Sequence, residues 1–136
     1  MANFDELIQD LWRLPRFSGP RQGFQPQVDV FRLEEPAELH VVVELPGVEP
    51  GDVHISLEGR LLTIAGERRR PTAGRRLSYY RLEIEYGPFA RRLLLPEDID
   101  VGATRATFER GLLTVVVPVA AKPPAAERVL ITVRTG

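Results

Sequence analysis

The sequence predicts an all-β fold, an immunoglobulin-like antiparallel β-sandwich, with a short N-terminal helical arm and an extended C-terminal tail. Three observations lead to this prediction. Between residues 28 and 118, apolar and polar side chains alternate with a period of two through several short runs. Turns rich in proline, glycine or charge separate the runs, and no helical segment lies between consecutive runs, which disfavours a parallel α/β sheet. The 136 residues, 43% of them hydrophobic, suffice for one domain with a sizeable core.

Residues 3–14 are expected to form an amphipathic helix. Asn3 is placed to cap it, Glu6 to complete a capping box, and Pro15 to end it. The apolar side chains that recur at helical spacing are Phe4, Leu7, Ile8, Leu11 and Trp12. A helix this short is marginal alone in water, so its apolar stripe should dock on another surface. That surface is either the core of this chain or, as we favour because β-strands build the core, the surfaces of other chains.

A proline- and glycine-rich segment, residues 16–27, is predicted to be a linker, because it has too few apolar side chains to order itself. A second proline-rich tether follows Pro118 and leads to an apolar end at 129–133. The expected organisation is therefore an arm of residues 1–25, a sandwich domain of residues 26–118 and a C-terminal extension of residues 119–136.

Short strands are expected to follow one another through the domain. They occupy residues 28–33, 39–45, 53–57, 61–65, 89–95, 104–108 and 112–117. The last two meet at Arg110-Gly111, where glycine permits a positive φ and the chain can reverse. Residues 112–117 are too continuously apolar to lie open to water, so a second sheet must cover them.

Composition excludes several classes of function. The chain has no cysteine, which rules out disulfides, thiolate catalysis and cysteine metal sites. Its net charge of −1 argues against general nucleic-acid binding, and we interpret the arginine-rich segment 67–78 as a solvated loop. No apolar run could span a bilayer, and the N-terminus carries acidic residues where a signal peptide would be basic. We therefore expect a cytoplasmic protein with no membrane partner.

A catalytic site is not indicated. His40 and His54 occupy polar-face positions of strands, so we interpret both as solvent-facing rather than as metal ligands. Ser18, Ser56 and Ser78 lack the Gly-x-Ser-x-Gly context of an activated nucleophile, and no phosphate-binding or dinucleotide-binding glycine motif occurs. We expect neither an enzyme nor a cofactor.

Four motifs, in order along the chain, resemble the α-crystallin domain of the small heat-shock proteins of the bacterial type. They are E-L-P-G-V at 44–48, L-L-T-I-A-G-E-R at 61–68, E-I-E-Y-G-P-F-A-R at 83–91 and A-x-x-x-x-G-L-L-T-V-x-V-P at 106–118. The sequence I-T-V at 131–133 resembles the tail motif of that family. Together, from about residue 26 to 133, they make coincidence improbable. One departure is Ile84, which stands where the commonest family form has arginine and removes one possible ion pair.

The resemblance implies an ATP-independent chaperone, or holdase, that binds unfolding proteins and prevents their aggregation under heat. Its partners would be itself, in dimers and larger homo-oligomers, and the unfolding clients, which we expect on the apolar stripe of the arm. One alternative is a p23-like co-chaperone module on the same sandwich, which would lack the terminal I-T-V and the partner-pairing loop. A secreted adhesion or sugar-binding sandwich is a second alternative, and the missing cysteines and export signal count against it.

The resemblance also assigns contact residues. Residues 77–82 look like the strand that pairs with the sheet of a partner subunit, and Glu83 would then reach Arg91 of that partner. The expected dimer interface comprises Leu77, Tyr79, Tyr80, Arg81, Glu83 and Arg91.

The tail residues Ile131 and Val133 point to one side of an extended chain, so both can enter one apolar groove. The resemblance places that groove on a neighbouring dimer, between residues 53–57 and 104–108. Its expected lining is Val53, Ile55, Leu57, Ala106 and Phe108. The alternative is that residues 129–133 form a last strand in the sheet of their own subunit.

Overall fold

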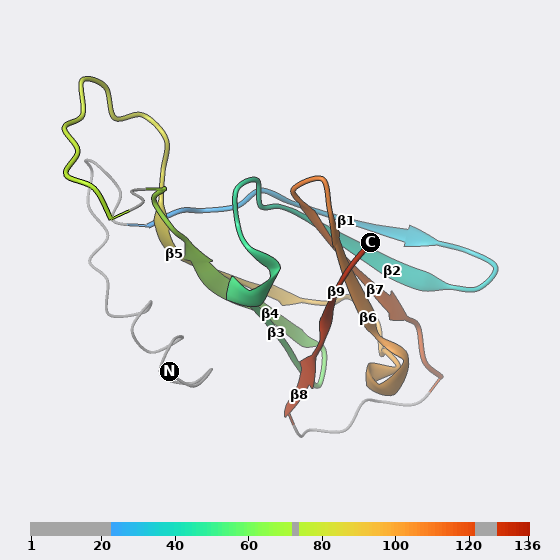
Figure 1. Cartoon of the computed structure of the whole chain (residues 1–136). Helices are drawn as coiled ribbons and strands as arrows, with labels where there is room; N and C mark the ends of the chain where they lie inside the picture. The colour runs from blue at the N-terminus through green and yellow to red at the C-terminus, as the bar shows by residue number, and fades with distance from the viewer. Residues whose placement is uncertain (1–22, 72–73, 122–127) are drawn as a thin grey trace.

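Two β-sheets lie face to face in the computed structural model, which describes residues 23–71, 74–121 and 128–136 (Figure 1). In the five-stranded sheet the order is β1-β2-β7-β6-β9, and in the four-stranded sheet it is β5-β4-β3-β8. The first sheet consists of β1 (Val28–Leu33), β2 (Glu38–Glu44), β7 (Leu112–Pro118), β6 (Arg105–Glu109) and β9 (Val133–Thr135). The second consists of β5 (Gly87–Leu94), β4 (Leu61–Arg68), β3 (Val53–Glu58) and β8 (Arg128–Ile131). The predicted all-β sandwich is confirmed.

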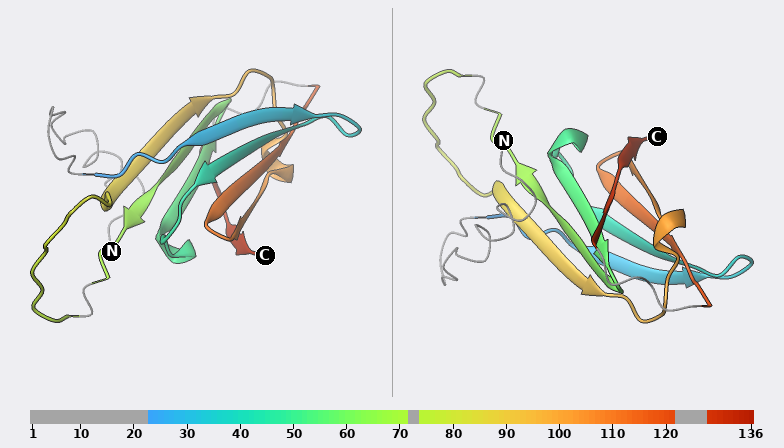
Figure 2. Two further views of the ribbon diagram at one scale, coloured as in Figure 1. Left: turned by 90° about the horizontal axis from the view of Figure 1, so that it is seen from above. Right: turned by 90° about the horizontal axis from the view of Figure 1, so that it is seen from below.

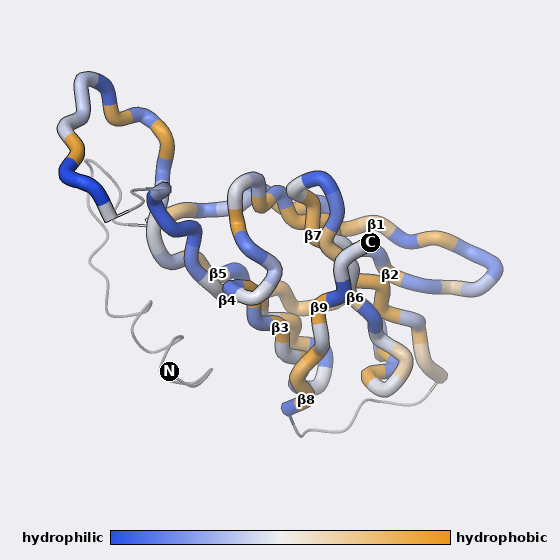
Figure 3. The backbone as a smooth tube through the Cα atoms, in the orientation of Figure 1, coloured by the Kyte–Doolittle hydropathy of each residue, from blue (hydrophilic) through white to orange (hydrophobic). Residues whose placement is uncertain are grey.

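The core forms where the inward faces of the two sheets meet. On β2, Leu39, Val41 and Val43 are buried, and the residues between them are only partly so. Their side chains oppose those of β3 and β4, among which Ile55 and Ile64 are almost completely buried. Hydrophobic stretches of the strands are interrupted by hydrophilic residues (Figure 3), and along β2 buried residues alternate with partly buried ones, as a period of two requires for a half-buried sheet.

The β6–β7 hairpin turns as the sequence predicts. Arg110 and Gly111 both have positive φ, 54° and 77°, the conformation of the two-residue turn that matches strand twist. The Gly111 carbonyl accepts a hydrogen bond of 2.8 Å from the amide of Leu45. A Cβ at Gly111 would lie 3.2 Å from Cα of Pro46. Both the backbone conformation and the close approach of Pro46 therefore favour glycine here.

A long loop joins β4 to β5 and extends away from the sandwich, as Figure 1 and both views of Figure 2 show. We call its described residues, 69–71 and 74–86, the projecting loop. They form neither helix nor strand within this chain, including residues 77–82, which were expected to pair with a partner. Two short 3-10 helices, η1 (Pro50–Asp52) and η2 (Val101–Ala103), lie in other connections. The expected helix 3–14 lies outside the described residues, among which no helix has the length and apolar character to cross a membrane.

Candidate interaction surfaces

The C-terminal tail lies across the open edges of both sheets. Strand β8 pairs antiparallel with β3, and β9 pairs in parallel with β6, so the tail joins the two sheets at one side of the sandwich (Figure 1). Ile131 lies opposite Ile55, and Val133 lies opposite Ala106. Both tail side chains are partly buried against the core, whereas Thr132 between them is exposed. This is the two-residue alternation that the sequence predicts for an extended tail.

Most of the expected groove residues lie beside the tail. Leu57 lies opposite Val129, and Phe108 lies opposite Thr135, in addition to Ile55 and Ala106. Val53 is buried on the same strand but has no partner in the tail ladder. In the described chain the tail therefore occupies the groove of its own sandwich. This resembles the alternative of a last strand in the same subunit, with the difference that the tail is divided between two sheets.

The projecting loop exposes large apolar and aromatic side chains. Tyr80 is fully exposed, and Leu82 and Ile84 are more than half exposed. Leu77 and Tyr79 are about half exposed. Side chains of this kind without cover are typical of a surface that binds another protein.

The remaining residues of the expected dimer interface have separate contacts within the chain. An oxygen of Glu83 lies 3.7 Å from Nη1 of Arg81, and both side chains are well exposed. Arg91 on β5 donates from Nη1 to the carbonyl of Pro26, at 2.8 Å. Glu83 and Arg91 are thus engaged with different groups in the single chain.

Arginine and tyrosine side chains hold part of the projecting loop in place. Arg70 lies over the rings of Tyr79 and Tyr86, at 5.3 and 5.0 Å from their centroids, and donates to the Tyr79 hydroxyl at 3.0 Å. Arg69 pairs with Asp52 of η1 at 2.9 Å. Exposed contacts of this kind contribute about 1 kcal/mol or less each.

Arg68, the last residue of β4, is buried at the base of the projecting loop with 8% of its surface exposed. Its guanidinium donates to the carbonyls of Glu85 and Pro46 and lies 3.7 Å from the centroid of the Phe24 ring. Burial was not predicted for either residue, since Arg68 lies in the segment expected to be a solvated loop and Phe24 in the expected linker. A signal was present, because alternation along β4 places Arg68 on the same face as the buried Leu62.

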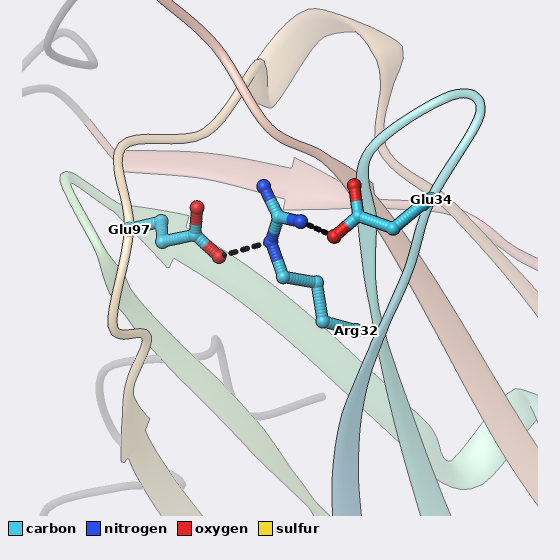
Figure 4. A network of polar contacts seen from close by, with 3 residues as sticks. All are labelled: Arg32, Glu34 and Glu97. Carbon is cyan, nitrogen blue, oxygen red and sulfur yellow. Dashed lines mark hydrogen bonds and ion pairs between the residues drawn. The ribbon is translucent and has the colours of Figure 1, made fainter.

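An exposed network of ion pairs links β1 to the loop that follows β5. Arg32, on β1, pairs with Glu34 in the following turn and with Glu97 in the loop after β5, where Nε and Oε2 are 2.8 Å apart (Figure 4). Because all three side chains are accessible to water, the network contributes about 1 kcal/mol or less to stability.

The prediction that both histidines face solvent was wrong for His40. His54 is exposed, but His40 stacks on Phe31 at 5.2 Å between ring centroids and lies 2.9 Å from a carboxylate oxygen of Glu38. Alternation places His40 on the outer face of the sheet, where the neighbouring Phe31 of β1 covers it. Within the described ranges, no group of three or more metal-ligating side chains is found.

Comparisons with known proteins agree with this architecture. The model of the Hsp20/alpha crystallin family matches residues 32–134. A 19.0 kDa class II heat shock protein of Oryza sativa subsp. japonica is 42% identical in an alignment 103 residues long, which covers 71% of this chain and 58% of that protein. Small heat shock protein C2 of Rickettsia felis is 30% identical over 115 residues, 85% of this chain and 73% of that protein. The chain thus spans little more than half the length of the rice relative.

Two solved structures are similar in fold. Heat shock protein 16.0 from Schizosaccharomyces pombe has a TM-score of 0.67 and 30% sequence identity, covering 78% of this chain and 96% of that one. A small heat-shock protein from Xylella fastidiosa has a TM-score of 0.62 and 32% identity, covering 80% and 98%.

Proposed function

Because the chain belongs to the Hsp20/alpha crystallin family, we propose that it is an ATP-independent molecular chaperone that binds unfolding proteins and keeps them from aggregating. The observation that carries the proposal is the match of the family model to residues 32–134, which includes β2 to β8 and most of β9. The p23-like alternative is not favoured, because the matched family is that of the small heat-shock proteins.

The proposed activity needs binding surface rather than chemistry. An unfolding protein exposes apolar side chains, and their transfer onto an apolar surface is favourable by about 25 cal/mol per Å². We assign client binding to the arm stripe Phe4, Leu7, Ile8, Leu11 and Trp12. Each contact is weak, so capture depends on several arms that act together in an assembly.

We propose that the projecting loop forms the dimer contact. Residues 77–82 are exposed and form neither helix nor strand in the described chain, so they are available to add a strand to a sheet edge. The apolar side chains that the loop exposes would be covered in the dimer. Glu83, which directly follows the segment, would exchange Arg81 for Arg91 of the partner and form a charge-assisted pair.

We propose further that tails join dimers by exchange. The contacts of Ile131 and Val133 with β3 and β6 can form equally with the same strands of a neighbouring dimer, since exchange of an identical element needs no new interface. The tail would then divide its time between its own groove and that of a neighbour. A high local concentration of subunits favours the second arrangement.

Two measurements on the whole chain test the proposal. Its mass in solution should exceed that of a dimer, and it should suppress the aggregation of an unrelated heated protein without ATP. A monomer that leaves aggregation unchanged would contradict the proposed function.

A further inference from the structure

The buried guanidinium of Arg68 depends on two loops for its hydrogen bonds. Nε donates to the carbonyl of Glu85 at 2.8 Å, Nη2 donates to the same oxygen, and Nη1 donates to the carbonyl of Pro46 at 3.2 Å. No buried side-chain nitrogen or oxygen in the described part of the chain lacks a hydrogen-bond partner. A buried charge is costly unless its donors are satisfied, so Arg68 favours the conformation in which Glu85 stays in place.

The other side of the Arg68 guanidinium contacts the end of the N-terminal arm, and we call Arg68, Phe24, Phe89 and Tyr86 the cluster. The Phe24 ring lies 3.7 Å from the Arg68 guanidinium carbon and packs edge-on against Phe89, with ring centroids 5.6 Å apart. The Phe24 amide donates to the carbonyl of Pro88 at 3.1 Å. A Cβ on Gly23 would lie 2.6 Å from the same oxygen, so glycine permits this close approach. The chain is therefore held against the start of β5 just before it enters β1.

The Arg68 guanidinium thus links the end of the arm, at Phe24, to the end of the projecting loop, at Glu85 and Tyr86. We propose that Arg68 couples the two, so that docking of Phe24 and fixing of the loop at Glu85–Tyr86 each favour the other. When Phe24 leaves, water reaches the guanidinium, and the hydrogen bonds to Glu85 weaken because the local dielectric rises. The Tyr86 ring, 5.4 Å from Arg68, contributes from the loop side.

The coupling has a consequence that rests on the proposed function. If the arm binds clients and the loop binds the partner subunit, a client that pulls Phe24 from its site loosens the dimer contact. Linkage is reciprocal, so loss of the partner also favours release of the arm. The free arm would then be more accessible to further clients.

A glutamate-specific protease applied to the full chain measures the coupling directly. The carbonyl of the peptide bond after Glu85 accepts hydrogen bonds from Arg68, and the bond after Glu83 serves as an internal reference. The ratio of the initial cleavage rates after Glu85 and after Glu83 therefore reports how strongly Arg68 fixes the loop at Glu85. Phe24→Ala should raise the ratio about five-fold, a typical effect of losing a partly buried cation–π contact. Phe31→Ala, an exposed aromatic of β1 outside the cluster, should leave the ratio unchanged. An unchanged ratio in Phe24→Ala, or an equal rise in Phe31→Ala, would overturn the proposal.

The reciprocal effect is measured at the Phe24 amide, whose hydrogen bond to Pro88 slows its hydrogen exchange while the arm is docked. Arg68→Lys keeps the charge but loses the planar fork, so exchange at Phe24 should become about five-fold faster. Exchange in β7 should not change, since β7 lies in the other sheet.

If Arg68→Lys also speeds exchange in β7, the decisive variant is Tyr86→Leu, which keeps every Arg68 hydrogen bond. Faster exchange at Phe24 in that variant supports the coupling, and unchanged exchange refutes it. Neither readout involves a client, so failure here leaves the aggregation assay as a separate test of the proposed function.

Discussion

Truncation of the two partly buried tail residues should dissociate the assembly without unfolding the domain. Ile131 and Val133 are partly buried against Ile55 and Ala106. At about 0.8 kcal/mol per buried methylene and partial burial, Ile131→Ala with Val133→Ala should weaken each tail contact by about 2 kcal/mol. That is a factor of about thirty in the equilibrium constant of each tail contact. An assembly held by several tails should then shrink towards dimers.

The domain itself should keep most of its stability in this double variant. Docking the tail orders several residues at about 1–2 kcal/mol each, which offsets most of the contact energy within one chain. The midpoint of thermal unfolding should therefore fall by no more than about 4 °C. Mass in solution and thermal unfolding are measured on the same sample.

Leu130→Ala is the matched control for the double variant. Leu130 lies beside Ile131 on β8 but is 64% exposed, so its truncation should leave the mass unchanged. If the double variant keeps its full mass, the tail does not join dimers. If the domain unfolds, the tail acts as a structural strand of its own sandwich.

Three further predictions concern the loop, the arm and the β6–β7 turn. Arg91→Glu and Glu83→Arg should each split the dimer, and the variant that carries both changes should restore it. Equilibrium sedimentation measures the dimer, and dimers of unchanged stability in both single variants would exclude the cross-subunit pair. Removal of residues 1–22, which leaves the docked end of the arm intact, should give a folded dimer that protects clients poorly in a light-scattering assay, and full protection would exclude the arm as the client site. Gly111→Ala should lower the free energy of unfolding, measured by denaturant titration, by about 1–3 kcal/mol, because the φ of Gly111 is positive. Gly51→Ala is the control and should not lower it, because a Cβ at Gly51 has no atom within 4 Å. Equal effects of the two substitutions would contradict the role of Gly111 in the turn.

The sandwich could be predicted from the sequence because alternation fixes which side chains face inward. The alternation puts Leu39, Val41 and Val43 on one face of their strand, which can be covered only by the opposite sheet. All three are buried. The same alternation predicted that Ile131 and Val133 would enter one groove together. The pattern does not state which copy of the groove they enter, since the contacts are the same in either copy.

The conformation of residues 77–82 and the surroundings of Arg68 and His40 could not be predicted, because they depend on contacts between different segments of the chain. Residues 77–82 have strand-like composition but pair with no strand among the described residues, and a strand needs a neighbour to satisfy its backbone. The burial of Arg68, in a segment predicted to be a solvated loop, could not be foreseen, because a buried arginine requires carbonyls that only the folded chain supplies. The partial burial of His40 could not be predicted either, because Phe31, which covers it, lies on the adjacent strand.

The most direct test of the central claim is light scattering from an unrelated protein heated with and without this chain, in the absence of ATP. The account predicts that scattering is suppressed when the chain is present at a comparable subunit concentration. Adding ATP should change nothing, because binding through apolar surface consumes no nucleotide. Scattering equal to that with the same mass of an inert protein, or suppression that requires ATP, would contradict the account.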